Sequence, residues 1–100
     1  MEHAETIKDI AAIIRQNLPA TYKVFLFGSW VEGRAVSTSD LDIGILGDNE
    51  VPGEVMRRIK AAATGLPTLR SIDIVDLRSV GEDFRRNVLA GAQELDAINL

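Results

Sequence analysis

Cysteine is absent from this chain of 100 residues, and histidine occurs once, at His3. The absence of cysteine excludes disulfides, thiolate metal ligands and cysteine nucleophiles. No apolar run is long enough to span a bilayer, and the first residues lack the basic start of a signal peptide, so we expect a cytoplasmic protein with no membrane association. The net charge of −4 is the wrong sign for nonspecific binding to nucleic acid, and no direct nucleic-acid partner is expected.

Helical and strand patterns alternate along the chain. The predicted helices cover residues 6–18, 29–35, 52–64 and 80–90. The predicted strands cover residues 22–27, 40–46 and 69–77. Residues 92–100 are expected to form a short helix or a tail. The length and the 46% hydrophobic content suit one domain, residues 1–100, of the α/β (α+β) class, with a small mixed sheet of three or more strands flanked by helices.

Two local signals predict where helices begin. Thr6 with Asp9, and Ser79 with Glu82, have the spacing of a capping box, in which two side chains bond reciprocally to backbone N–H groups of the first helical turn. Pro19 is expected to stop the first helix.

Two carboxylates, Asp40 and Asp42, open the second predicted strand. Residues two apart in a strand share a face, so these two carboxylates point the same way. Leu41, Ile43 and Ile45 then point the other way, into a core. Two like charges side by side repel, and a divalent cation that binds both is the most economical reason to tolerate the repulsion.

A Gly-Ser pair, Gly28-Ser29, follows the first predicted strand. Glycine at a strand-to-helix turn lets the backbone come close to a ligand. The N–H groups that open the next helix then face a phosphate, and the serine hydroxyl adds a donor. A phosphate site and metal-binding carboxylates at one edge of one sheet are the equipment of phosphoryl or nucleotidyl transfer.

Together, Gly28-Ser29, Gly33 and Ser39-Asp40-Leu41-Asp42 resemble the signature of the DNA polymerase beta-type nucleotidyltransferase superfamily. For so short a chain, the most similar branch is the minimal nucleotidyltransferase (MNT) branch, whose members typically act as antitoxins to HEPN-domain toxins. The resemblance covers nearly the whole chain. It implies the nucleotidyltransferase fold, ATP as the substrate, Mg²⁺ (two ions) as the cofactor, and a HEPN-type toxin as the partner in a hetero-oligomer.

The resemblance also implies a third carboxylate on a neighbouring strand. Asp73 lies mid-strand among apolar neighbours and is the better candidate, whereas Asp76 lies near the strand end and is expected to make a local turn or cap bond. Asp40, Asp42 and Asp73 are then the expected catalytic residues and metal ligands. The expected contacts to the nucleotide are Gly28, Ser29, Arg34 and Ser39.

In the implied reaction, a hydroxyl of the toxin, expected on a tyrosine, attacks the α-phosphorus of ATP. Pyrophosphate leaves, and the AMP that stays on the toxin neutralises it. Two other functions stay open: a noncatalytic antitoxin that covers its partner's active site, and the catalytic subunit of a two-component small-molecule nucleotidyltransferase. Glu32 near the phosphate path, and a site open on one side, favour the binding module.

The individual residues also have plainer interpretations. An Asp-x-Asp pair taken alone is most often a solvated start of a strand, and a serine at Ser29 is a common helix N-cap. A charge such as that of Arg34 is most often a solvated loop charge. The combination of the Gly-Ser turn, the carboxylate pair and Asp73 favours the nucleotidyltransferase interpretation.

Overall fold

The computed structural model describes residues 2–28, 40–68 and 70–95. Helices and strands alternate along most of the chain, as predicted. The helices are α1 (Glu2–Asn17), α2 (Gly53–Thr64) and α3 (Glu82–Gly91). The strands are β1 (Lys23–Phe27), β2 (Leu41–Leu46), β3 (Ile72–Asp76) and β4 (Gln93–Leu95). The predicted short helix over residues 29–35 lies outside the described residues.

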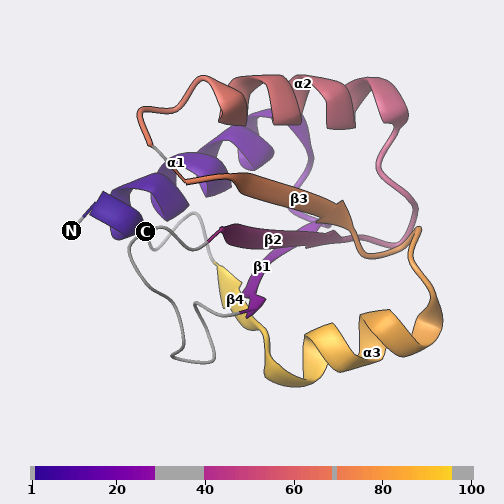
Figure 1. Cartoon of the computed structure of the whole chain (residues 1–100). Coiled ribbons are helices and arrows are strands. Elements are labelled where there is room, and N and C mark those ends of the chain that lie inside the picture. The colour runs from indigo at the N-terminus through magenta and orange to yellow at the C-terminus, as the bar shows by residue number, and fades with distance from the viewer. Residues whose placement is uncertain (1, 29–39, 69, 96–100) are drawn as a thin grey trace.

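The four strands form one mixed sheet in the order β3-β2-β1-β4. β2 pairs antiparallel with β1 and parallel with β3, and β4 pairs antiparallel with the other side of β1. In Figure 1, α1 and α2 lie above the sheet, α3 lies below it, and β3 is the strand nearest the viewer. The predicted mixed sheet with flanking helices is therefore confirmed.

The core lies between the sheet and the pair α1 and α2. The alternation predicted for β2 is confirmed, because Leu41, Ile43 and Ile45 are fully buried. The helices contribute apolar side chains at helical spacing, since α1 buries one continuous stripe and α2 buries Ile59. The stripe of α1 and the residue after it comprises Ile7, Ile10, Ala11, Ile14 and Leu18.

Residues 93–95 correct the prediction of a helix or a tail, because they form the strand β4, whereas residues 96–100 lie outside the described residues. Its register places Leu95 opposite Val24, and both side chains are buried. The physical reason is the free edge of β1, whose N–H and C=O groups need partners that β2 supplies on one side only. A strand of three residues with a single apolar side chain has too little pattern to be predicted from sequence.

The two predicted capping boxes are wrong. α1 begins at Glu2, four residues before Thr6, which is buried inside the helix. At α3 the N-cap is Gly81 without a side-chain cap bond, and the Ser79 hydroxyl donates instead to the carbonyl of Asp76 at 3.0 Å. The start of α3 is fixed by Arg85, whose Nη1 donates to the Leu77 carbonyl at 3.1 Å.

Among the described residues, no helix is long and apolar enough to cross a membrane.

Candidate active site

The candidate site lies where the C-terminal end of β1 meets the N-terminal ends of β2 and β3. β1 runs antiparallel to β2, and β3 runs parallel to β2, so these three strand ends lie at the same end of the sheet. The register places Asp42 opposite Phe27 on β1 and opposite Asp73 on β3. The predicted Gly28 turn and the predicted carboxylates therefore come together, although their positions in the sequence are far apart.

Gly28 is in direct contact with the Asp42 carboxylate. Its φ of 82° lies in the left-handed region, the only such value among the described residues. A Cβ added to Gly28 would overlap Asp42 Oδ2 and would lie 3.2 Å from Asp42 Cγ. Both facts require glycine here, since any other residue would be strained and would displace the carboxylate. The Gly28 backbone thus comes close to the group that is expected to bind a ligand.

Like charges and partial burial raise the pKa of Asp42 above its usual value. Burial is the larger cause, and the carboxylates of Asp73 and then Asp40 add repulsion. Asp42 is half-buried, whereas Asp40 and Asp73 are exposed. In residues 2–28, 40–68 and 70–95, no lysine or arginine forms an ion pair with any of the three. The carboxylates therefore repel one another without a described counter-charge.

The exposure of Asp73 corrects one step of the sequence argument. Asp73 lies on β3, the outermost of the described strands, and is exposed, so the cost of burying a charge falls on the half-buried Asp42 instead. What selects Asp73 is its register, directly beside Asp42 on the parallel strand.

The interpretation of Asp76 as a residue with local bonds is confirmed. Its Oδ1 accepts from the Arg78 N–H at 3.0 Å. Its Oδ2 also accepts from the N–H of Val51 at 2.8 Å, a contact between distant parts of the chain. Asp76 thus ties β3 to the segment that leads into α2, and its carboxylate is already occupied.

The donor set suits a hard cation. Carboxylate oxygens are the ligands that Mg²⁺ prefers, and Mg²⁺ usually takes one or two of them together with phosphate oxygens and water. A cation would also relieve the charge repulsion, which adds to burial in raising the pKa of Asp42. Within the part of the chain that the structure describes, no group of three or more carboxylates or histidines forms a metal site by itself. Asp40, Asp42 and Asp73 could therefore supply only part of the ligand set of such a cation.

Three of the predicted contacts to the nucleotide, Ser29, Arg34 and Ser39, lie outside the described residues. Of the predicted site, the described residues contain Gly28, Asp40, Asp42 and Asp73.

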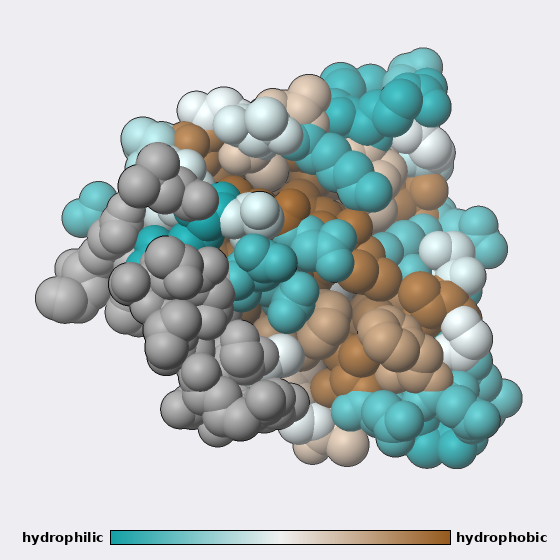
Figure 2. Space-filling model, viewed as in Figure 1, coloured by the Kyte–Doolittle hydropathy of each residue, from teal (hydrophilic) through white to brown (hydrophobic). Residues whose placement is uncertain are grey.

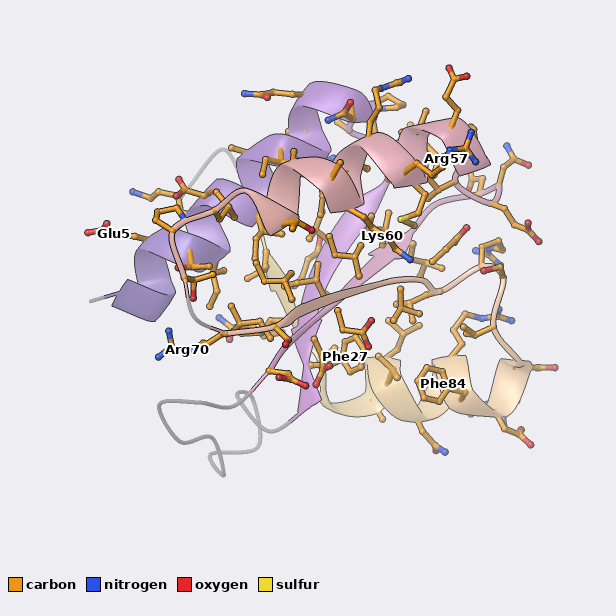
Figure 3. The ribbon with its side chains drawn as sticks, turned by 45° about the horizontal axis from the view of Figure 1, so that its top comes forward. Glu5, Phe27, Arg57, Lys60, Arg70 and Phe84 are labelled. Carbon is orange, nitrogen blue, oxygen red and sulfur yellow. The ribbon has the colours of Figure 1, made fainter. Side chains whose placement is uncertain are left out.

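Sequence reasoning missed an apolar cavity of about 240 Å³ beside Gly28. Phe27 of β1 and Phe84 of α3 line it, together with Asn87 and Val88. Figure 3 shows Phe27 and Phe84 on the α3 side of the sheet, and Figure 2 shows apolar side chains gathered between β3 and α3. Phe84 is 48% exposed. The available signal was the four-residue spacing of Phe84 and Val88, which places both on one face of α3.

A glycine turn packed on a strand carboxylate, with a second carboxylate on the parallel neighbour, suits phosphoryl or nucleotidyl transfer. The comparison with protein families agrees, since residues 8–96 match the family described as polymerase beta, nucleotidyltransferase. The chain belongs to this family.

Within the family, the chain is similar to proteins named MntA. It is 32% identical over 82 residues to a probable protein adenylyltransferase MntA of Haemophilus influenzae, an overlap of 82% of this chain and 71% of the relative. It is 29% identical over 90 residues to the protein adenylyltransferase MntA of Shewanella oneidensis, an overlap of 86% of this chain and 61% of the relative.

Solved structures share the fold. A crystal structure of a toxin–antitoxin with AMP-PNP aligns with a TM-score of 0.65 and 26% identity, over 89% of this chain and 70% of the other.

Proposed function

We propose that this chain is a Mg²⁺-dependent protein adenylyltransferase that acts as an antitoxin, transferring AMP from ATP to a hydroxyl of a partner HEPN-type toxin. The observation that carries the proposal is Asp42, held between Gly28 and Asp73 with a raised pKa in a chain of the nucleotidyltransferase family. The MntA relatives support protein adenylylation, and the similar structure with AMP-PNP supports ATP and a toxin partner. The site of action is the cytoplasm.

Each residue of the candidate site has its own role in the proposed reaction. Asp40 and Asp42 would hold Mg²⁺, and Asp73 would either help to hold a second ion or accept the proton of the attacking hydroxyl. The metal would neutralise phosphate charge and polarise the α-phosphorus. The Gly28 backbone, which has no side chain to keep a ligand away, approaches the outer phosphates. Ser29, Arg34 and Ser39 add donors to the same phosphates.

The reaction is an in-line displacement at the α-phosphorus. The toxin hydroxyl, expected on a tyrosine, forms the new P–O bond as the bond to pyrophosphate breaks. Where Asp73 does not ligate a metal ion, it accepts the proton of that hydroxyl, because its exposed carboxylate makes no hydrogen bond within the described residues. Because the candidate site is on the surface of one small domain, the toxin supplies the wall that the chain lacks.

One observation favours a second candidate, a noncatalytic antitoxin that acts by binding alone. The carboxylates in the described part of the chain do not form a complete metal site by themselves. A chain that no longer bound Mg²⁺ and ATP would still present the same surface to a toxin.

The mass of the partner toxin tests the proposal. A partner HEPN-type toxin is incubated with this chain, ATP and Mg²⁺, and its intact mass is measured. We expect a gain of one or more AMP groups that disappears with Asp42→Asn. An unmodified toxin that still binds would favour the noncatalytic antitoxin. Pyrophosphate release with a soluble acceptor alone would favour the small-molecule enzyme.

A further inference from the structure

β3 has one edge that no described strand covers. Among the described strands it is the last of the sheet on its side, and it pairs with β2 alone. The Leu41 N–H donates to the Ser71 carbonyl at 2.9 Å, and the Leu77 N–H donates to the Ile45 carbonyl at 2.8 Å. Backbone groups alternate in direction along a strand, so the residues between Ser71 and Leu77 at odd positions also bond to β2.

The even residues therefore present their backbone groups to the outside. The N–H and C=O of Ile72 and Ile74 point away from β2, as does the N–H of Asp76. The Asp76 carbonyl is the exception, because it accepts from the N–H of Ser79 at 3.1 Å. An edge of this kind is a template for another strand, which natural proteins usually cover or blunt.

A groove follows this edge. Its volume is about 530 Å³, and its lining includes four consecutive residues of β3, 73–76. One face of a strand would contribute only every second residue, so the groove runs along the edge itself. Met56 and Lys60 of α2 form the opposite wall. In Figure 3 Lys60 points from α2 toward β3.

The groove is acidic. Glu50, Asp73 and Asp76 line it against a single cation, Lys60. Two N–H groups already bond to the Asp76 carboxylate, while the side chains of Glu50 and Asp73 make no hydrogen bond or ion pair within the described residues. Charge complementarity selects a segment with net positive charge.

We propose that the free edge of β3 binds an extended, positively charged segment of the partner toxin as an added strand. The inference rests on the proposed function, because it names how the acceptor reaches the site. Main-chain hydrogen bonds to Ile72 and Ile74 supply affinity, and side chains of alternating direction supply specificity.

The added strand places one of its side chains beside the carboxylates of the candidate site. Neighbouring strands lie about 4.8 Å apart, and side chains on one face of a sheet adjoin across strands. Half of the segment's side chains enter the groove beside Met56 and Lys60. The other half lie on the face of Asp42 and Asp73, where one hydroxyl-bearing residue is placed beside Asp73.

Hydrogen exchange of single backbone amides tests the added strand. The Asp42→Asn chain is used, so that the toxin stays unmodified, and exchange is compared with and without the toxin. We expect the Ile72 and Ile74 amides to exchange at least about tenfold more slowly in the complex. The Asp73 and Val75 amides, already bonded to β2, serve as the internal control. Binding without protection of Ile72 and Ile74 overturns the inference and leaves the proposed function standing.

A charge reversal gives a second test without disturbing the strand. Glu50→Lys is expected to weaken toxin binding about tenfold and to raise the KM for toxin without changing kcat. The matched control is Asp48→Lys, an equal charge change on an exposed residue outside the groove. Equal effects of the two variants contradict the proposed docking site. A wild-type chain that neither binds nor modifies the toxin removes the proposed function as well.

Discussion

The two faces of the sheet differ in what they contribute. The face toward α1 and α2 is apolar and closed, with Ile43 and Ile74 among the side chains that pack there. The opposite face has Asp42 beside Asp73 at its edge and α3 over its other part. One face stabilises the fold through burial, whereas the other holds charges that repel one another.

This difference shows how so small a chain can carry a site that destabilises it. Burial of the apolar side chains on the face toward α1 and α2 is favourable. On the site face, the raised pKa of Asp42 indicates that its charged form is disfavoured in the folded state. Destabilised groups of this kind are commonly retained where function needs them.

The largest expected effect is on transfer. Asp42→Asn removes the carboxylate that is held between Gly28 and Asp73. In the proposed function this carboxylate binds the metal ion, and such a ligand is worth several kcal/mol in the transition state. We expect the rate of AMP transfer to fall on the order of 10³-fold, with the far-ultraviolet circular dichroism unchanged. Single-turnover assays measure the rate, and retained transfer would contradict the assignment of Asp42.

Substitutions on the face toward α1 and α2 should lower the stability of the fold. Ile43→Ala leaves a cavity beneath α1 and α2 and is expected to lower the free energy of unfolding by about 2–5 kcal/mol. Chemical denaturation measures the loss. Leu46→Ala, a truncation of a half-buried side chain on the same strand, is the comparison and should cost less. Equal costs would show that the two faces do not differ in packing.

Gly28 connects the fold to the site. Gly28→Ala introduces strain at a φ of 82° and a clash with the Asp42 carboxylate, so we expect a loss of about 1–2 kcal/mol in stability together with a loss of transfer. Gly53→Ala is the control, because an added Cβ there meets only Arg57 Nη1 at 3.7 Å. A Gly28→Ala variant that retains full transfer activity would contradict the proposed approach of the Gly28 backbone to the nucleotide.

The two aspartates of β3 should separate function from stability. Asp73→Asn is expected to reduce transfer with little change in stability, since its carboxylate is exposed. Asp76→Ala is expected to cost about 1–3 kcal/mol, because the Val51 N–H loses its acceptor. Thermal unfolding and transfer assays on both variants make the comparison, and the reverse pattern would exchange their roles.

The smallest effect is electrostatic. The pKa of Asp42 is raised in the folded state, so the folded chain binds a proton at this carboxylate more readily than the unfolded chain does. Stability from this group is present below the usual aspartate pKa of 3.8 and is lost as the pH rises through the raised value. Asp42→Asn should therefore stabilise the fold at pH 7, by less than about 1 kcal/mol for a partly exposed group. The stability gained by Asp42→Asn should vanish at the acidic end of a series of unfolding measurements at different pH. A variant less stable than the wild type at pH 7 would contradict the raised pKa of Asp42.

The sequence predicts the parts of this molecule that carry strong periodicity. In β2 the alternation of Asp42 with Leu41 and Ile43 predicts both faces of the sheet, and Gly28 predicts a turn where φ is positive. β4 was beyond reach, because its pairing depends on the free edge of β1 and not on its own three residues. The capping box at Thr6 is wrong because α1 already begins at Glu2. The one at Ser79 is wrong because Gly81 is the N-cap of α3, and the Ser79 hydroxyl donates to the Asp76 carbonyl in the preceding turn.

Labelled ATP shows which phosphate reaches the toxin and whether Asp42 is needed for the transfer. The toxin is incubated with this chain, Mg²⁺ and ATP labelled at either the α- or the γ-phosphate, and with the Asp42→Asn variant in parallel. We predict that the α-label enters the toxin, that the γ-label leaves as pyrophosphate, and that the variant transfers neither. Label from the γ-phosphate on the toxin, or undiminished α-label transfer by the variant, would contradict an adenylyltransferase site built on Asp42.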